Sequence, residues 1–409
     1  MNKEQRTVLV LSAIIYLVMT GVTMISPILP EYGDTLGASV PMVGFLVAGF
    51  AIARVFLSLP AGIFGDRVGN KTTMSIGLAI ISFSSLIAYL ALIVNQTYAY
   101  GYAVLLMARV LEGAGSAFYA TMSTSYLAKN TSIERRGRYM SIYVGALLLG
   151  QVSGPGIGGL VAVNFGINAP FLFYALATGV ALMVLLILIE KDRGISGDEL
   201  AQQDLRGDIK KVFSNRSFII VNLGTLAAFF ARGGVIATLF PIMARQNFGL
   251  DASMIGLVLT GVAVTSLITM LSGGVLADKY GRKLPFFGSM ILGGVSALLI
   301  PLAWDVPTLA LTMLIFGLSL GLSGPMAAWA ADLSEPKTMG TAMGVYRTIG
   351  DAGFILGPMV LTGVATLADP NIITALPFVI CFFWLTITGL ILLKAEDPAS
   401  KKVVAPPAF

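Results

Sequence analysis

The sequence predicts an all-α integral membrane protein whose twelve transmembrane helices form two six-helix bundles, related by a pseudo-two-fold axis along the membrane normal. Three observations lead to this fold class: the composition, the spacing of the apolar runs and an internal repeat. Hydrophobic residues make up 56% of the 409 residues and charged residues 11%, with a mean hydropathy of +0.86. Because a soluble domain carries roughly 25% charged residues, this composition indicates a chain that resides largely in lipid.

Apolar runs of about 20 residues recur along the chain, and each is long enough to cross the hydrocarbon core of a bilayer, about 30 Å thick. The expected spans cover about 8–30, 42–64, 73–94, 99–121, 138–163, 169–189, 217–243, 252–276, 284–304, 307–331, 341–367 and 371–393. The first run is too long for a signal-peptide core and has no small-residue cleavage site. We therefore expect it to remain as the first span.

The distribution of basic residues predicts the orientation. Of the 26 Lys and Arg, 21 lie at the ends of the spans that share a side with the N-terminus and four lie at membrane depth, whereas Arg245 lies in an opposite loop. The positive-inside rule then places both termini in the cytoplasm of a multi-pass protein of the plasma (cytoplasmic) membrane. The net charge of +5 is therefore expected to attract anionic membrane lipids rather than nucleic acid.

The residue types exclude several kinds of chemistry. The chain has a single cysteine, Cys381, and no histidine. An internal disulfide and a cysteine metal cluster are thereby excluded, and the commonest metal ligand is missing. We expect no metal, no cofactor and no enzymatic activity.

The chain divides into two halves at a polar stretch, Glu190–Ser217. The predicted parts are an N-terminal bundle (1–190), a cytoplasmic linker (191–216), a C-terminal bundle (217–395) and a cytoplasmic tail (396–409). In the linker, apolar residues are spaced as in an amphipathic helix on the inner membrane surface, and a solvated tether is an equally good reading. These residues are Leu200, Leu205, Ile209, Val212 and Phe213.

The two halves also resemble each other. A shift of 212 residues aligns Gly44–Lys71 with Gly256–Lys283 without a gap, and the matched loops share their Asp, Gly and Lys. A shift of 203 residues aligns the fifth span with the eleventh, including Gly154 with Gly357. Repeats of equal orientation arise from two bundles related by an axis along the membrane normal.

Three motifs resemble those of a known family. "GIFGDRVGNK" (Gly62–Lys71) and "GVLADKYGRK" (Gly274–Lys283) are similar to the loop signature of the major facilitator superfamily. "RVLEG" (Arg109–Gly113) is similar to the Arg-x-x-Gln-Gly motif of its twelve-span drug:proton antiporters, and "GQVSGPGIGG" (Gly150–Gly159) to an antiporter motif of span five. The chain departs from these patterns at Asn70, where the family usually has Arg, and at Glu112, where it usually has Gln.

The resemblance implies that the two signature loops stabilise the state in which the cytoplasmic side is closed. We expect Asp66 and Asp278 to face the N-terminus of a neighbouring helix, and the basic residues to meet lipid phosphates or acidic partners. A topology anchor without a gating role is the alternative. The candidate gating residues are Gly62, Asp66, Arg67, Gly69, Lys71, Gly274, Asp278, Lys279, Gly281, Arg282 and Lys283.

The glycine-rich stretch of span five predicts a close helix contact. Gly150, Gly154 and Gly158 recur every four residues and share one helix face, Gly159 follows them, and Pro155 bends the helix. Such a face lets a partner backbone approach closely. The resemblance implies that it packs against a helix of the other half and seals the outward side, and ordinary tight packing is the alternative.

Ionisable residues inside spans cost about 2.5–3.5 kcal/mol on insertion scales and are functional candidates by default. The candidates for substrate binding or proton coupling are Arg54, Arg109, Glu112, Arg232, Arg347 and Asp351. Arg109/Glu112 and Arg347/Asp351 have the spacing of pairs on one helix face. In each pair, one alternative is that the two charges compensate each other permanently. In the other, the carboxylate binds a proton when substrate or a conformational change removes the arginine.

The sequence therefore favours a secondary transporter that works by alternating access. The leading hypothesis is proton-coupled export of amphipathic small molecules, such as drugs or metabolites, by a monomer. Because arginines outnumber acids at membrane depth, the alternative is an organic anion carrier, working by symport or exchange, in which these arginines hold the anion. A lipid flippase is a third reading.

Overall fold

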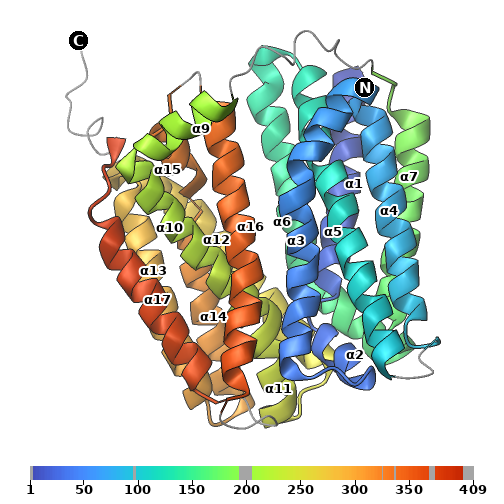
Figure 1. The fold of residues 1–409 in the computed structure, drawn as a ribbon, viewed down its shortest axis with the longest axis vertical. Helices are drawn as coiled ribbons and strands as arrows, with labels where there is room; N and C mark the ends of the chain where they lie inside the picture. Colours follow the sequence, from blue (N-terminus) through green and yellow to red (C-terminus); the bar gives the residue numbers. More distant parts are fainter. Residues whose placement is uncertain are drawn as a thin grey trace. The chain divides into compact units, whose positions relative to one another are not determined.

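The computed structural model describes residues 3–94, 98–192, 205–324, 326–335, 338–367 and 374–398. In these ranges the regular structure is helical. Eleven helices are long and apolar enough to span a membrane, and the apolar helix Leu376–Leu392 is somewhat shorter. The predicted fold class, an all-α multi-pass membrane protein, is confirmed (Figure 1).

The first compact unit comprises Met1–Gln202 together with Leu250–Thr260. Its helices are α1 (Lys3–Met24), α2 (Leu29–Thr35), α3 (Val40–Val68), α4 (Asn70–Leu90), α5 (Tyr98–Lys129), α6 (Ile133–Phe165) and α7 (Ala169–Leu188). In Figure 1 the long helices of this unit run side by side: α4 packs against α5 and α7, and α1 against α6 and α7.

The second unit comprises Gln203–Gly249 and Gly261–Phe409. Its elements are α9 (Leu205–Ser214), α10 (Arg216–Ala231), the π-helix η1 (Arg232–Leu239), α11 (Phe240–Phe248), α12 (Ala252–Tyr280, whose first turns belong to the first unit), α13 (Lys283–Leu299), the 3₁₀ turn η2 (Ile300–Leu302), α14 (Val306–Leu322), α15 (Met326–Asp332), α16 (Met339–Ala365) and α17 (Leu376–Leu392). Its packing repeats that of the first unit, with α10 against α16 and α17, and α13 against α14 and α17.

Some span boundaries differ from those predicted. The first span does not continue to residue 30: α1 ends at Met24 and α2 begins at Leu29. Pro27 and Pro30 lie at this break, and proline cannot donate the backbone hydrogen bond that a continuing helix needs. The seventh span is interrupted by η1, and the tenth is divided into α14 and α15.

The linker contains a helix, α9, at the place where the amphipathic pattern predicted one. Val212 is buried, whereas Ile209 and Phe213 remain 42% and 45% exposed. The exposed apolar side chains suit a helix that rests on a membrane surface. Residues 193–204, which include Leu200, lie outside the described part, as do residues 399–409 of the tail.

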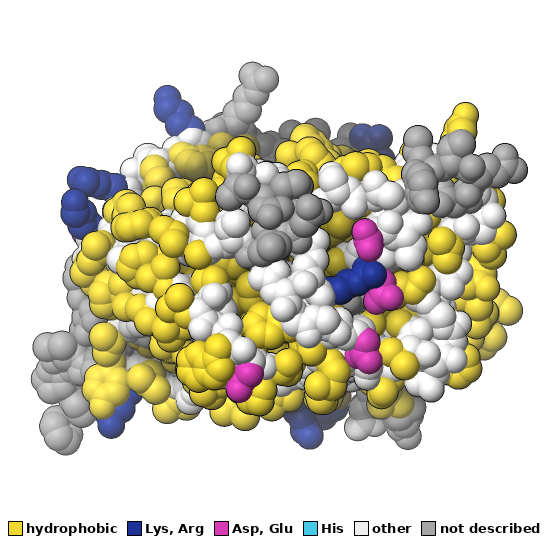
Figure 2. Space-filling model, turned by 90° about the horizontal axis from the view of Figure 1, so that it is seen from below, with side chains coloured by type: hydrophobic (Ala, Val, Ile, Leu, Met, Phe, Trp, Pro, Cys, Tyr) yellow, Lys and Arg dark blue, Asp and Glu magenta, His cyan; other side chains and the backbone are white. Residues whose placement is uncertain are grey.

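Figure 2 shows a face of the molecule on which most side chains are hydrophobic or uncharged and a few acidic and basic side chains gather. A scarcity of basic residues is typical of the outward side of a membrane protein. The orientation with cytoplasmic termini stays a prediction.

Candidate functional site

A buried ion pair lies on α5. The Arg109 guanidinium donates to Glu112 Oε2 over 2.5 Å, one helical turn away, and the two side chains are only 6% and 1% exposed. Arg109 Nε also donates to the backbone oxygen of Leu46 on α3, at 3.4 Å. The pairing predicted from the spacing of three residues is confirmed. Because both charges are desolvated, each depends on the other for compensation.

The ring of Phe50 on α3 brings a second arginine to this pair. The Arg109 guanidinium carbon lies 5.0 Å from the ring centroid and that of Arg54 lies 5.8 Å from it, both within cation–π range. The helices can meet here because Gly113 has no side chain: a Cβ at this position would overlap the backbone oxygen of Phe50. The motif glycine thus sets the distance between α3 and α5.

Two polar atoms near the ion pair have no hydrogen-bond partner among the described residues. They are Glu112 Oε1 and the hydroxyl of Tyr174 on α7. Tyr174 interacts electrostatically with both Glu112 and Arg109, and its ring lies against Gly21 of α1, where a Cβ would overlap it. A buried carboxylate oxygen without a donor is costly in a permanent structural pair.

The second unit contains the other candidates. Arg232 begins η1, and its electrostatic neighbour is Tyr346 on α16. Arg347 and Asp351 both lie on α16, but Arg347 is exposed whereas Asp351 is buried, with 7% exposure. The two members of this predicted pair therefore have different surroundings.

The glycine stripe of α6 contacts α1. A Cβ on Gly150 would come within 2.6 Å of the backbone oxygen of Tyr16, and one on Gly158 would overlap the backbone oxygen of Met24. The second unit repeats this contact, because Gly353 and Gly357 of α16 approach the backbone of α10 in the same way. The expected close approach of backbones is confirmed, but the partner of this face is a helix of the same half.

A different face of α6 contacts the start of α12. Cβ atoms on Gly159 and Gly256 would overlap the backbone oxygens of Ala252 and Pro155 respectively. The contact with a helix from the second half of the sequence therefore involves Pro155 and Gly159, beside the stripe of Gly150, Gly154 and Gly158. The periodicity of the glycines predicted a close helix contact here, and only the fold separates the face toward α1 from the face toward α12.

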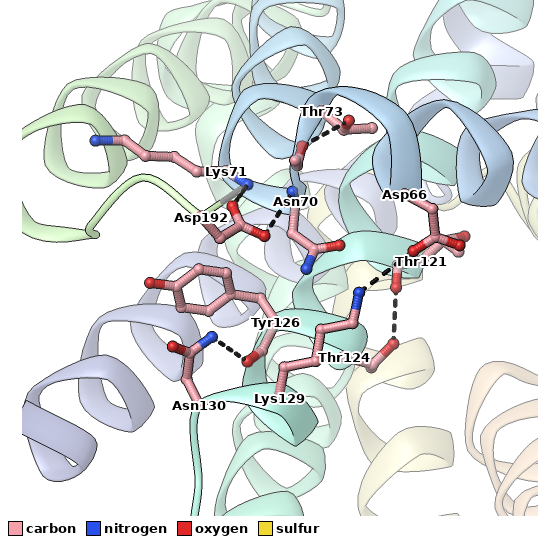
Figure 3. Close-up of polar contacts among 11 residues, drawn as sticks. Asp66, Asn70, Lys71, Thr73, Thr121, Thr124, Tyr126, Lys129, Asn130 and Asp192 are labelled. Carbon is pink, nitrogen blue, oxygen red and sulfur yellow. Dashed lines mark hydrogen bonds and ion pairs between the residues drawn. The ribbon is translucent and has the colours of Figure 1, made fainter. Parts of the chain in front are cut away.

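The first signature loop holds the ends of four helices together (Figure 3). Asp66 pairs with Lys129 at the end of α5, with Nζ and Oδ1 3.3 Å apart. The carboxylate at a helix N-terminus is instead that of Asp192, which follows α7 and accepts the backbone N–H groups of Asn70 and Lys71, both at 2.9 Å. Asp66, for which such a contact was predicted, pairs here with Lys129, and its contact with a helix N-terminus stays a prediction.

The second signature loop repeats the arrangement. Lys283 donates its backbone N–H to Asp397 over 2.9 Å and its Nζ to the backbone oxygen of Leu393 over 3.1 Å. In the first unit, Lys71 Nζ donates in the same way to Leu186, at 2.8 Å. Each lysine thus joins the start of the third span of its half to the end of the sixth. The Nζ atoms of these lysines bind backbone carbonyls of the protein, whereas the sequence predicted lipid phosphates or acidic partners.

The other signature residues differ in their environments. Arg282 lies between two carboxylates, 2.9 Å from Asp278 and 3.3 Å from Asp332. Gly69 and Gly281 adopt φ of +97° and +90°, a conformation that favours glycine. A Cβ would meet little or nothing at Gly62 and Gly274, and Arg67 and Lys279 are exposed.

The sequence matches the family model of the Major Facilitator Superfamily over residues 11–244 and 221–408. The chain belongs to the major facilitator superfamily. Among the similar proteins of this superfamily, Multidrug resistance protein 2 of Bacillus subtilis (strain 168) is 28% identical over 366 residues, which cover 87% of this chain and 88% of that protein. The Chromaffin granule amine transporter of Rattus norvegicus is 26% identical over 77% of this chain and 59% of its own length.

A solved structure shows the same fold. The bacterial homologue of the human lysosomal transporter Spinster, in an inward-facing and occupied conformation, aligns with a TM-score of 0.77 at 16% identity, over 98% of both chains. Membership of the superfamily makes the protein a secondary transporter of small molecules, and not an enzyme.

The acidic residues that bind the third span of each half were not among the site residues predicted from the sequence. Asp192 and Asp397 lie outside the signatures, but a shift of 205 residues relates them, close to the shifts of 212 and 203 already found. Aromatic side chains repeat beside them: Tyr126 donates to the backbone oxygen of Glu190 and Trp329 to that of Glu396. The internal sequence repeat, when it is continued to the ends of the sixth and twelfth spans, aligns Asp192 with Asp397 and is the signal that locates them.

Asp192→Ala is expected to lower the free energy of unfolding by about 1–2 kcal/mol, the range of N-terminal caps, because the first turn of α4 loses its acceptor. Thermal unfolding of the purified protein in detergent measures this change. Asp397→Ala should act similarly on α13. The double variant should show the sum of the two decreases in the free energy of unfolding, since the two caps lie in different units. An unchanged unfolding midpoint in Asp192→Ala would show that water replaces the cap.

Proposed function

We propose that this protein exports amphipathic small molecules in exchange for protons, and that Glu112 is the coupling acid. The observation that carries the proposal is the buried Arg109–Glu112 pair, in which one carboxylate oxygen has no hydrogen-bond partner among the described residues. A carboxylate that is sealed from water and held by a single arginine changes its protonation when that arginine moves.

Antiport requires that substrate and proton compete for the same site. Arg109 is held by Glu112, by the Leu46 carbonyl and by the ring of Phe50. If rocking of the helices separates Glu112 from Arg109 once substrate has left, the isolated buried carboxylate favours its neutral, protonated form. Proton uptake and substrate release then become linked events.

The similar proteins support small amphipathic cargo. One relative is named a multidrug resistance protein and another an amine transporter. For this chain we extend the proposal to a monomer in the plasma membrane with cytoplasmic termini, whose signature loops and α6 seam stabilise alternating states. The Asp192 and Asp397 contacts would keep the inner end of each six-helix bundle rigid while the bundles move.

Proton release from acid-loaded proteoliposomes tests the proposal. A pH dye reports release when quaternary ammonium, neutral or sulfonate amphiphiles are added outside, with protein-free liposomes as the blank. We expect at least one class to trigger release that Glu112→Gln abolishes, because an amide cannot carry the proton. Glu335→Gln, which removes an exposed carboxylate, should behave as wild type.

Asp351→Asn separates the two candidate acids in the same assay. Release that is lost in Asp351→Asn but retained in Glu112→Gln would move the coupling role to Asp351. A response to anions alone that survives both substitutions would contradict proton antiport and indicate anion exchange with structural carboxylates. No release with any class would also contradict it.

A further inference from the structure

Arg232 is a deeply placed cation whose charge has no acidic partner in the described part of the chain. It lies near the middle of the candidate span Arg216–Phe248. Arg109, by contrast, has its carboxylate at one turn's distance. Among the described residues neither an ion pair nor a hydrogen bond is formed by the Arg232 guanidinium. A charge at this depth normally pairs with another group or marks a substrate pathway.

The surroundings of Arg232 leave it available to a ligand. Protein encloses it, yet its side chain keeps part of its surface accessible. Tyr346 of α16 is its electrostatic neighbour and is also partly accessible. The Tyr346 hydroxyl has no hydrogen-bond partner within the described ranges. A cationic fork and a hydroxyl without a partner in the described ranges therefore lie within electrostatic range of each other, on two helices that glycine-to-backbone contacts hold together.

The local fold holds these two groups in place. Arg232 begins the π-helix η1, whose wide turn Thr238 supports by donating its hydroxyl to the Gly233 carbonyl over 2.9 Å. A Cβ on Gly233 or Gly234 would come within 2.9 Å of the backbone oxygen of Phe354 or Gly357, so η1 lies directly against α16. Such π-segments are frequent at functional sites, and rigid support pre-organises a binding group.

From this geometry we infer that Arg232 and Tyr346 form a binding subsite for an anionic oxygen group of the substrate, such as a carboxylate. The guanidinium presents parallel N–H donors that match the two oxygens of a carboxylate, and the tyrosine hydroxyl adds a further donor. The inference rests on the transport function proposed above and specifies its cargo. The substrates are amphipathic molecules with an apolar body and a carboxylate or a similar acidic group.

Three compounds with one skeleton test the charge preference: 4-phenylbutyrate, 4-phenylbutanamide and 4-phenylbutylamine. The probe is the thermal unfolding midpoint of the purified full-length protein in detergent, followed by intrinsic tryptophan fluorescence. We expect the carboxylate to raise the midpoint at lower concentration than the amide or the amine. A charge-assisted contact corresponds to an affinity difference of about tenfold or more.

Variants assign the preference to the subsite. Arg232→Met should remove it, Tyr346→Phe should weaken it, and Arg232→Lys should retain part of it, because lysine keeps the charge but lacks the fork. Arg245→Gln, which changes a cation on α11 of the same span, should leave the preference intact. Equal responses to the three compounds, or a preference that survives Arg232→Met, would overturn the inference.

The protein without ligand provides a second readout. Since the Arg232 charge is uncompensated, Arg232→Met should raise the unfolding midpoint, whereas a lower midpoint would show that the arginine has a structural partner and would overturn the subsite. Neither readout uses a proton gradient. Glu112→Gln should therefore keep the carboxylate preference even where it abolishes proton release, and the two proposals can fail separately.

Discussion

Gly158→Ala is expected to destabilise the protein strongly, whereas Gly145→Ala on the same helix should stabilise it slightly. A Cβ at Gly158 would overlap the backbone oxygen of Met24, so α1 and α6 must separate to admit it. Backbone atoms cannot rotate away as a side chain does, so we expect a loss at the upper end of the range of about 1–3 kcal/mol for overpacking. Thermal unfolding in detergent measures the difference.

Gly145 is the matched control, because a Cβ there would meet nothing within 4 Å. Alanine at this position gains up to about 1 kcal/mol of helix propensity without a new contact. The two variants make the same chemical change on one helix, and only the packing differs. Equal unfolding midpoints would show that α1 and α6 do not hold the close contact seen here.

The second large effect concerns the buried ion pair. Glu112→Ala should destabilise the protein by about 3–5 kcal/mol, because it leaves Arg109 buried and unpaired. The double variant Arg109→Met/Glu112→Leu removes both charges and fills a similar volume. Its unfolding midpoint should return to the wild-type value or exceed it, since apolar replacements of buried pairs are often neutral or stabilising. The measurement is again thermal unfolding.

Transport by the double variant separates stability from function. If the pair couples protons, the variant should be stable but inactive in the proton-release assay. The rate of proton release should fall by more than any difference in the amount of reconstituted protein explains. A stable double variant with full proton release would show that Arg109 and Glu112 serve the fold alone. A double variant as unstable as Glu112→Ala would instead show that the pair is needed for packing.

The repeat that relates the two halves extends beyond the sequence motifs to contacts within each half. The glycine contacts between α1 and α6 return between α10 and α16, and the Asp192 cap returns at Asp397. The charged groups do not follow this repeat: the first unit contains a buried ion pair, and the second contains Arg232 without an acidic partner in its described part. Under the two proposals above, proton coupling would belong to the first unit and recognition of an acidic substrate group to the second.

The sequence alone determined the features that depend on short-range spacing. Apolar runs predicted the spans, because the bilayer thickness fixes how long a helix must be. The spacing of three residues predicted the Arg109–Glu112 pair, because residues three apart on a helix are neighbours. The four-residue spacing of Gly150, Gly154 and Gly158 predicted a close backbone contact, because residues four apart share one face of a helix.

The tertiary structure alone decided which elements meet. It showed that the stripe on α6 faces α1 while Gly159 faces α12, and that Asp192 rather than Asp66 caps α4. It also showed that η1 interrupts the seventh span and that no described acid pairs with Arg232. In lipid, both the outer and the inner faces of a helix are apolar, so hydrophobic periodicity does not report how each helix is rotated. Contacts between residues distant in sequence depend on that rotation, and only the folded helices fix it.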